Sequence, residues 1–124
     1  MDKHGYMLGE VEGRFADIIW AKEPISSSEL VKIGADEFGW KRTTTHNVIR
    51  RLCDKGLFCR NESGIVTATL TKEEYRSQQT SSFVDRLCGG SLPMFVSGFV
   101  KQRKLSEDEI SEIIGLLRKD ESKD

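Results

Sequence analysis

The chain has 124 residues, 37% of them hydrophobic, and its 19 basic and 20 acidic side chains leave a formal charge of −1. This length fits one compact domain, or one small domain with an appendage. No apolar stretch approaches the roughly 20 residues of a membrane span, and the N-terminus lacks the apolar segment of a secretory signal. We therefore expect a cytoplasmic protein with no membrane partner.

The three cysteines are an odd number and include no Cys-x-x-Cys pair. Cys53, Cys59 and Cys88 therefore fit a reducing compartment better than a disulfide framework. A metal site would need further ligands, and the two histidines of the chain supply few. We expect no metal and no cofactor, with the thiols acting as small half-buried hydrophobes. A redox sensor built on Cys53 and Cys59 remains an alternative.

The first 40 residues predict two helices. Apolar residues recur at helical spacing over residues 9–21, namely Leu8, Val11, Phe15, Ile18 and Ile19. Pro24 ends this helix, because proline cannot continue it. Ser26 and Glu29 have the spacing of a capping box, which opens a second helix that fades near Gly39.

A third helix is predicted over residues 42–55, with Gly56 as its C-terminal glycine. Its apolar face consists of Thr45, Val48, Ile49 and Leu52. Two β-like runs follow, at residues 57–60 and 65–70. The Asn, Ser and Gly residues between them favour a tight turn, which indicates a β-hairpin. Three helices followed by a hairpin is the order of a winged helix-turn-helix domain.

The rest of the chain is predicted to be helical. Capping boxes at Thr71–Glu74 and Ser106–Glu109, and a capping Ser91, each precede an amphipathic stretch, and Gly89 with Gly90 ends the first of these helices. We therefore expect a mainly α fold with a small β-hairpin. Residues 1–71 would form a winged-helix DNA-binding domain and residues 72–124 a helical dimerisation region.

The apolar stripes of these C-terminal helices predict a homodimer, because one chain cannot bury all of them and most soluble oligomers are closed and symmetric. The alternative is a stripe that packs back onto the N-terminal domain. The residues predicted for the dimer interface are Tyr75, Phe83, Leu87, Leu92, Phe95, Val96, Phe99, Val100, Ile110, Ile113, Ile114 and Leu117.

Residues 40–60 hold six basic side chains against one acid, Asp54, while the C-terminal segment is acidic. This asymmetry is expected if one element meets a polyanion. Base edges would be read by Thr43, Thr44, His46 and Asn47. Phosphates would be bound by Lys41, Arg42, Arg50, Arg51, Lys55 and Arg60, with Ser63 in the hairpin turn as a further contact. The alternative is a solvated helix face without a ligand.

Several segments in the same order resemble the penicillinase and methicillin-resistance repressor family (BlaI/MecI type), which includes copper-transport repressors. They are Glu12, Asp17–Trp20, Thr44–Thr45, Ile49–Leu52, Asp54–Leu57, Arg86–Gly90, Phe99–Val100 and Leu105–Ile110. The resemblance implies a homodimeric winged-helix repressor that binds palindromic operator DNA, in front of genes such as those for β-lactamase. It also implies that positions 43, 44 and 46 face the operator.

Two departures from the family pattern concern its regulation. Family members are released by a sensor protease that cuts before a phenylalanine preceded by asparagine. Here that pair is Gly98-Phe99, which speaks against such a protease as a partner. The chain also lacks the C-terminal Cys-x-Cys pair, which disfavours the copper-responsive branch.

The sequence thus predicts a DNA-binding transcriptional repressor. The alternative is a winged-helix module that binds another protein and lacks sequence-specific DNA binding. An enzyme is not expected, because the chain has no Ser/His/Asp set and no phosphate-binding glycine loop.

Overall fold

The computed structural model describes residues 8–121. In chain order its elements are α1 (Glu10–Lys22), β1 (Ile25–Ser26), α2 (Ser27–Phe38), α3 (Arg42–Asp54), β2 (Phe58–Arg60), β3 (Ile65–Ala68), α4 (Lys72–Cys88), α5 (Leu92–Gln102) and α6 (Glu107–Glu121). The contacts divide the chain into two compact units between Phe83 and Val84, within α4. The mainly α fold predicted from the sequence is confirmed.

The strands form one antiparallel sheet in the order β1-β3-β2. Phe58 pairs with Ala68 and Arg60 with Val66 in the predicted hairpin, and Ile25 pairs with Val66 on the other side of β3. The prediction of a two-stranded hairpin was therefore incomplete, because β1 was missed. A two-residue strand shows no alternation of its own, and its pairing with β3 defines it.

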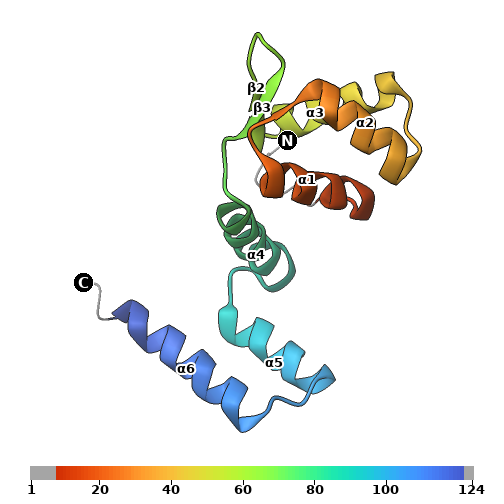
Figure 1. Cartoon of the computed structure of the whole chain (residues 1–124). Helices are drawn as coiled ribbons and strands as arrows, with labels where there is room; N and C mark the ends of the chain where they lie inside the picture. The colour runs from red at the N-terminus through yellow and green to blue at the C-terminus, as the bar shows by residue number, and fades with distance from the viewer. Residues whose placement is uncertain (1–7, 122–124) are drawn as a thin grey trace. The chain divides into compact units, whose positions relative to one another are not determined.

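The core of the first unit lies between the sheet and the first three helices (Figure 1). Its largest fully buried side chains are Phe15, Phe58, Ile19, Leu30, Ile49, Leu52, Val66 and Thr45. Val11 belongs to the apolar residues at helical spacing, but it does not join the core, because 46% of it is exposed. Ala16 completes the buried face of α1 in its place.

Hydrogen bonds at the helix starts confirm the predicted caps. The Ser26 hydroxyl accepts from the Glu29 N–H at 3.1 Å, and Ser91 accepts from the Met94 N–H at 3.2 Å. At the other two boxes the bonds run both ways, over 2.9 and 3.0 Å at Thr71–Glu74 and 3.1 Å each at Ser106–Glu109. These bonds satisfy N–H groups that helix starts otherwise leave unpaired.

Two glycines shape the junction of α2 and α3. Gly39 ends α2 at a φ of 68°, a conformation that favours glycine. The turn places Trp40 with its ring centroid 4.6 Å from Phe38 and 5.1 Å from Phe15. At Gly34, an added Cβ would run into the Thr45 hydroxyl of α3. The two helices therefore approach closely where α2 has no side chain.

The start of α4 packs within the first unit. The Leu8 N–H donates to the Tyr75 hydroxyl at 3.0 Å, and the Tyr75 ring lies 5.7 Å from Trp20. Lys72 forms an ion pair with Asp17 at 3.0 Å. Tyr75 was assigned to the dimer interface from the sequence, but these contacts occupy it inside one chain. The predicted division after residue 71 therefore precedes helical turns that pack on α1.

Between residues 8 and 121, no helix is both long and apolar enough to cross a membrane. Over the same residues, no three His, Cys, Asp or Glu side chains lie close enough together to hold a metal ion.

Candidate DNA-binding surface

The two faces of α3 have opposite character. Thr45, Val48, Ile49 and Leu52 are buried against the core. On the other side Thr43, Thr44, Asn47 and Arg50 are exposed, as are Lys41 and Arg42 at the helix start. The first turn contains no acid, and its N-cap residue Lys41 makes no side-chain capping bond. The positive end of the helix dipole therefore meets solvent beside two cations, an arrangement that suits a phosphate.

Two arginines orient the polar side chains of α3. Arg50 Nη2 donates to Asn47 Oδ1 at 3.0 Å within the helix. Arg60 reaches from β2 and places Nη1 3.1 Å from His46 Nδ1. Burial, with the positive charges of Arg60 and Arg42, lowers the pKa of His46. The imidazole is therefore neutral at pH 7, because its ordinary pKa already lies below that pH.

The hairpin turn at Asn61–Gly64, here called the wing, is tied to the start of α2. Gly64, at a φ of 81°, presents its carbonyl to both the N–H and the hydroxyl of Ser27, each at 2.8 Å. Asn61 Oδ1 accepts from the Ile65 N–H at 2.9 Å. Ser63 is exposed at the tip beside Glu62. The wing thus presents a hydroxyl and a carboxylate on a fixed backbone.

Glu12 of α1 binds two of the cations that the sequence analysis assigned to phosphate. Its Oε2 lies 3.1 Å from Arg51 Nε and its Oε1 lies 3.0 Å from Lys55 Nζ. Burial acts to raise the pKa of Glu12, but the hydrogen bonds and charges of Lys55 and Arg51 outweigh it, and the pKa is lowered. Arg51 and Lys55 are therefore neutralised in part by a carboxylate of the chain itself.

The structure thus divides the predicted DNA-binding residues. It brings Arg60 to the face of α3 that holds the predicted base-reading residues and Arg50, and it turns Arg51 and Lys55 toward α1. The pairing of Glu12 with these two cations was not predicted from the sequence. No local spacing could have found it, because Glu12 is 39 residues from Arg51 and 43 from Lys55.

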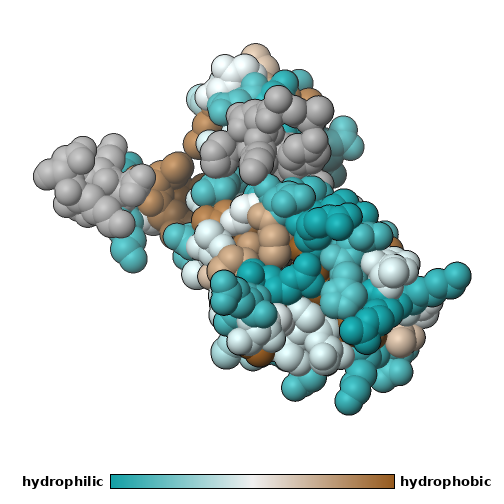
Figure 2. Space-filling view, turned by 90° about the horizontal axis from the view of Figure 1, so that it is seen from above, coloured by the Kyte–Doolittle hydropathy of each residue, from teal (hydrophilic) through white to brown (hydrophobic). Residues whose placement is uncertain are grey.

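A second candidate surface lies on the second unit, where α5 buries none of its residues. Its exposed apolar side chains are Leu87, Leu92, Met94, Val96, Phe99, Val100, Ile110, Ile113, Ile114, Leu116 and Leu117. Figure 2 shows mostly hydrophilic side chains (teal) on one face of the molecule, with hydrophobic side chains (brown) in small groups. All the residues predicted for the dimer interface in α5 and α6 belong to this apolar surface except Phe95, which is half-buried.

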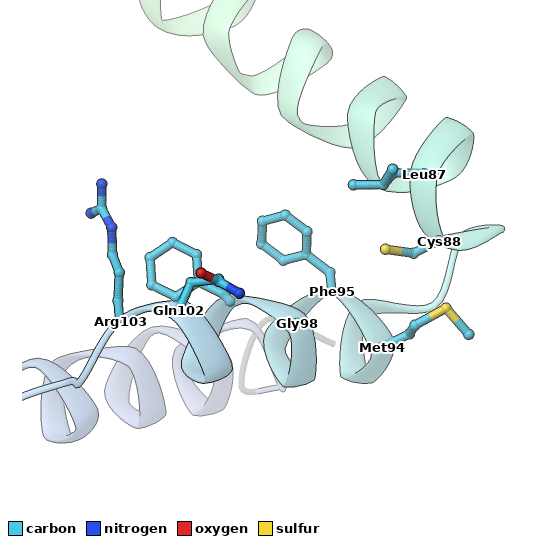
Figure 3. Close-up of a pocket in the computed structure, with 8 residues that line it drawn as sticks. Leu87, Cys88, Met94, Phe95, Gly98, Gln102 and Arg103 are labelled. Carbon is cyan, nitrogen blue, oxygen red and sulfur yellow. The ribbon is translucent and has the colours of Figure 1, made fainter.

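The same unit contains an apolar pocket of about 350 Å³ between the end of α4 and α5. Leu87 and Cys88 point from α4 toward Phe95 (Figure 3). The guanidinium of Arg103 lies 5.4 Å from the Phe99 ring at the other end. The peptide bond between Gly98 and Phe99 lies inside α5.

Comparisons with known proteins agree over most of the chain. The family model described as penicillinase repressor matches residues 8–119. The methicillin resistance regulatory protein MecI of Staphylococcus aureus strain Mu50 is 25% identical over 122 residues, which are 96% of this chain and 99% of MecI. The penicillinase repressor of Bacillus licheniformis is 25% identical over 113 residues, covering 89% of this chain and 88% of that repressor.

Among solved structures, a multiple antibiotic-resistance repressor (MarR) from Listeria monocytogenes is similar, with a TM-score of 0.45 and 16% identity. The similarity covers 93% of this chain and 73% of the Listeria chain.

Proposed function

Because the chain belongs to the penicillinase repressor family, we propose that it is a homodimeric repressor that binds palindromic operator DNA. The family and the winged-helix order of α1, α2, α3 and the sheet identify a DNA-binding transcription regulator and not an enzyme. The pairing of two chains and the two-fold symmetry of the operator are the parts that we propose.

The outward face of α3 carries this proposal. Thr43, Thr44 and Asn47 are exposed and offer hydrogen-bond donors and acceptors, which is what reading base edges in the major groove requires. Arg50 and Arg60 border them, and Lys41 and Arg42 begin the helix. Cations at these borders suit phosphates, which position a protein on the duplex without specifying sequence.

The exposed apolar side chains of α5 and α6 support pairing of two chains. Val96, Phe99 and Val100 are each 39–45% exposed, and Ile113 and Ile114 are 41% and 46% exposed. Contiguous apolar patches of this kind mark interaction sites. A closed two-fold dimer would bury them and present two copies of α3. Its half-sites would lie one helical turn of DNA apart, or a multiple of it.

Duplex binding measured against salt tests the proposal. We expect affinity to fall steeply as salt rises from ~50 to ~200 mM, because cations bound to phosphates displace counterions. Arg50→Ala should weaken binding to every duplex and flatten the logarithmic salt slope by about one unit. Lys104→Ala, which removes an exposed cation between α5 and α6, is the matched control and should change neither.

Asn47→Ala separates base reading from phosphate binding. It should weaken the binding free energy by ~1–3 kcal/mol for the preferred site and change it little for other sequences. Equal losses on both kinds of DNA would remove Asn47 from the reading set. No binding of the unaltered protein to any duplex at ~50 mM salt would overturn the proposal in favour of a protein-interaction module.

A further inference from the structure

Three charged side chains join α1 to the C-terminal half of α3. The Glu12 carboxylate uses a separate oxygen for each cation, at 3.1 Å from Arg51 Nε and 3.0 Å from Lys55 Nζ. The side chains of Glu12 and Lys55 are only 18% and 20% exposed, whereas that of Arg51 is 54% exposed. Partly buried pairs are screened less by salt than exposed ones. The pair between Glu12 and Lys55 is therefore weakened less by salt than the pair between Glu12 and Arg51.

The two cations lie beside the candidate reading face. With about 100° of rotation per residue, Arg51 is about 40° and Lys55 about 80° around the helix from Asn47. Thr44, on the same flank, is about 60° from Asn47. Released from Glu12, these two long side chains would extend along the flank where a groove-bound helix passes the phosphate backbone.

The Glu12 carboxylate lowers the positive charge that this flank of α3 presents to DNA. The cluster of two cations and one anion has a net charge of +1, where Arg51 and Lys55 alone would have +2. A phosphate that approached it would also meet the negative charge of Glu12. The attraction of the surface for any duplex is therefore lower on this flank than the sequence of α3 alone would give it.

We propose that Glu12 limits the affinity of this surface for the DNA backbone, because it withholds Arg51 and Lys55 from phosphates. This inference rests on the proposed function. Phosphate contacts supply essentially all non-specific affinity, so withholding two cations lowers the affinity for any duplex. Glu12 acts through the two cations and does not itself touch DNA.

The test is the salt dependence of binding to a mixed-sequence duplex that lacks the preferred site. Each phosphate neutralised adds about 0.9 to the logarithmic slope. Glu12→Gln, which keeps the shape of the side chain and removes its charge, should steepen the slope by about one to two units. The double variant Glu12→Gln with Arg51→Gln should lose about half of that gain.

Glu10→Gln is the matched control. Glu10 is exposed in the first turn of α1, and it holds no cation in the ion pairs of residues 8–121. Its neutralisation removes the same charge from the same helix without releasing Arg51 or Lys55, so the slope should stay as in the unaltered protein. An equal steepening in both variants would mean that net charge alone acts, and would overturn the proposal.

A second comparison holds even if Glu12→Gln fails to fold. In the otherwise unaltered protein, Arg51→Gln should leave the slope unchanged while Arg50→Gln flattens it by about one unit. If Arg51→Gln flattens the slope as much, Arg51 meets phosphate despite Glu12 and the proposal is wrong. Failure of the unaltered protein to bind any duplex at ~50 mM salt would instead refute the proposed function itself.

Discussion

Arg60 Nη1 lies 3.1 Å from His46 Nδ1, so a residue at the base of the wing fixes a side chain on α3. A guanidinium has only donors, and Nδ1 must therefore accept. Because the pKa of His46 is lowered, the ring is neutral at pH 7 and carries its proton on Nε2. His46 thus offers an N–H donor, and the base atoms that suit it are acceptors such as guanine N7 and O6.

Arg60→Ala should raise the pKa of His46, because it removes a positive charge that disfavours the imidazolium. The rise should be partial, since burial is the larger cause of the lowered pKa and Arg42 also remains. Arg60→Lys keeps the charge and should raise the pKa less. An NMR titration of the His46 ring in the three proteins measures this. A pKa that falls in Arg60→Ala would contradict the account of the contact.

Gly34→Ala should destabilise the first unit by ~1–3 kcal/mol, the usual cost of overpacking a core. The added methyl would run into the Thr45 hydroxyl, and Thr45 is fully buried. Denaturant unfolding measures the loss. Gly98→Ala is the control, because a Cβ there meets nothing within 4 Å. Equal stability of Gly34→Ala and the unaltered protein would show that α2 and α3 can separate without cost.

Local features of the chain were predictable from the sequence, and contacts between distant residues were not. The caps at Thr71 and Ser106 depend on residues three positions apart, and the two faces of α3 follow from its helical period. The bond from the Leu8 N–H to Tyr75 joins residues 67 apart. An apolar side chain such as Tyr75 fits an external stripe or an internal contact equally well, and only the packing of α4 against Trp20 distinguishes them.

The same difference between local features and distant contacts holds for the candidate DNA-binding surface. Charge indicated which helix to propose as the DNA-binding element, because the cations are concentrated in α3 whatever their partners. It could not divide Arg50 from Arg51, which are adjacent in sequence but face different neighbours. That division needs the position of α1.

Glu12→Gln should also lower stability, by roughly 1 kcal/mol at neutral pH, because Arg51 is largely exposed and such pairs contribute little. The folded state lowers the pKa of Glu12. Its stabilisation is therefore fully present above the pKa of the unfolded chain and is lost as the pH falls through the folded pKa. Free energies of unfolding measured against pH should converge for the two proteins in acid. A difference that stays constant to the acid end would contradict this.

Phe99→Ala should weaken the proposed dimer, because Phe99 is assigned to the dimer interface and to no contact with DNA. Each buried aromatic or aliphatic side chain of this size contributes ~1.5–3 kcal/mol, and a two-fold interface loses two of them. The dimer dissociation constant should therefore rise by at least ~100-fold. Equilibrium sedimentation at micromolar concentrations measures it. Sedimentation of the unaltered protein only as a 14.0 kDa species would contradict the proposed dimer.

Two copies of α3 are proposed to read one two-fold DNA site. Repeated selection of bound duplexes from a random-sequence pool tests it directly. We expect an enriched inverted repeat whose half-sites lie 10–10.5 base pairs apart, or a multiple of that spacing. Asn47→Ala should weaken this enrichment. Recovery of an asymmetric single half-site, or of no common sequence, would contradict it.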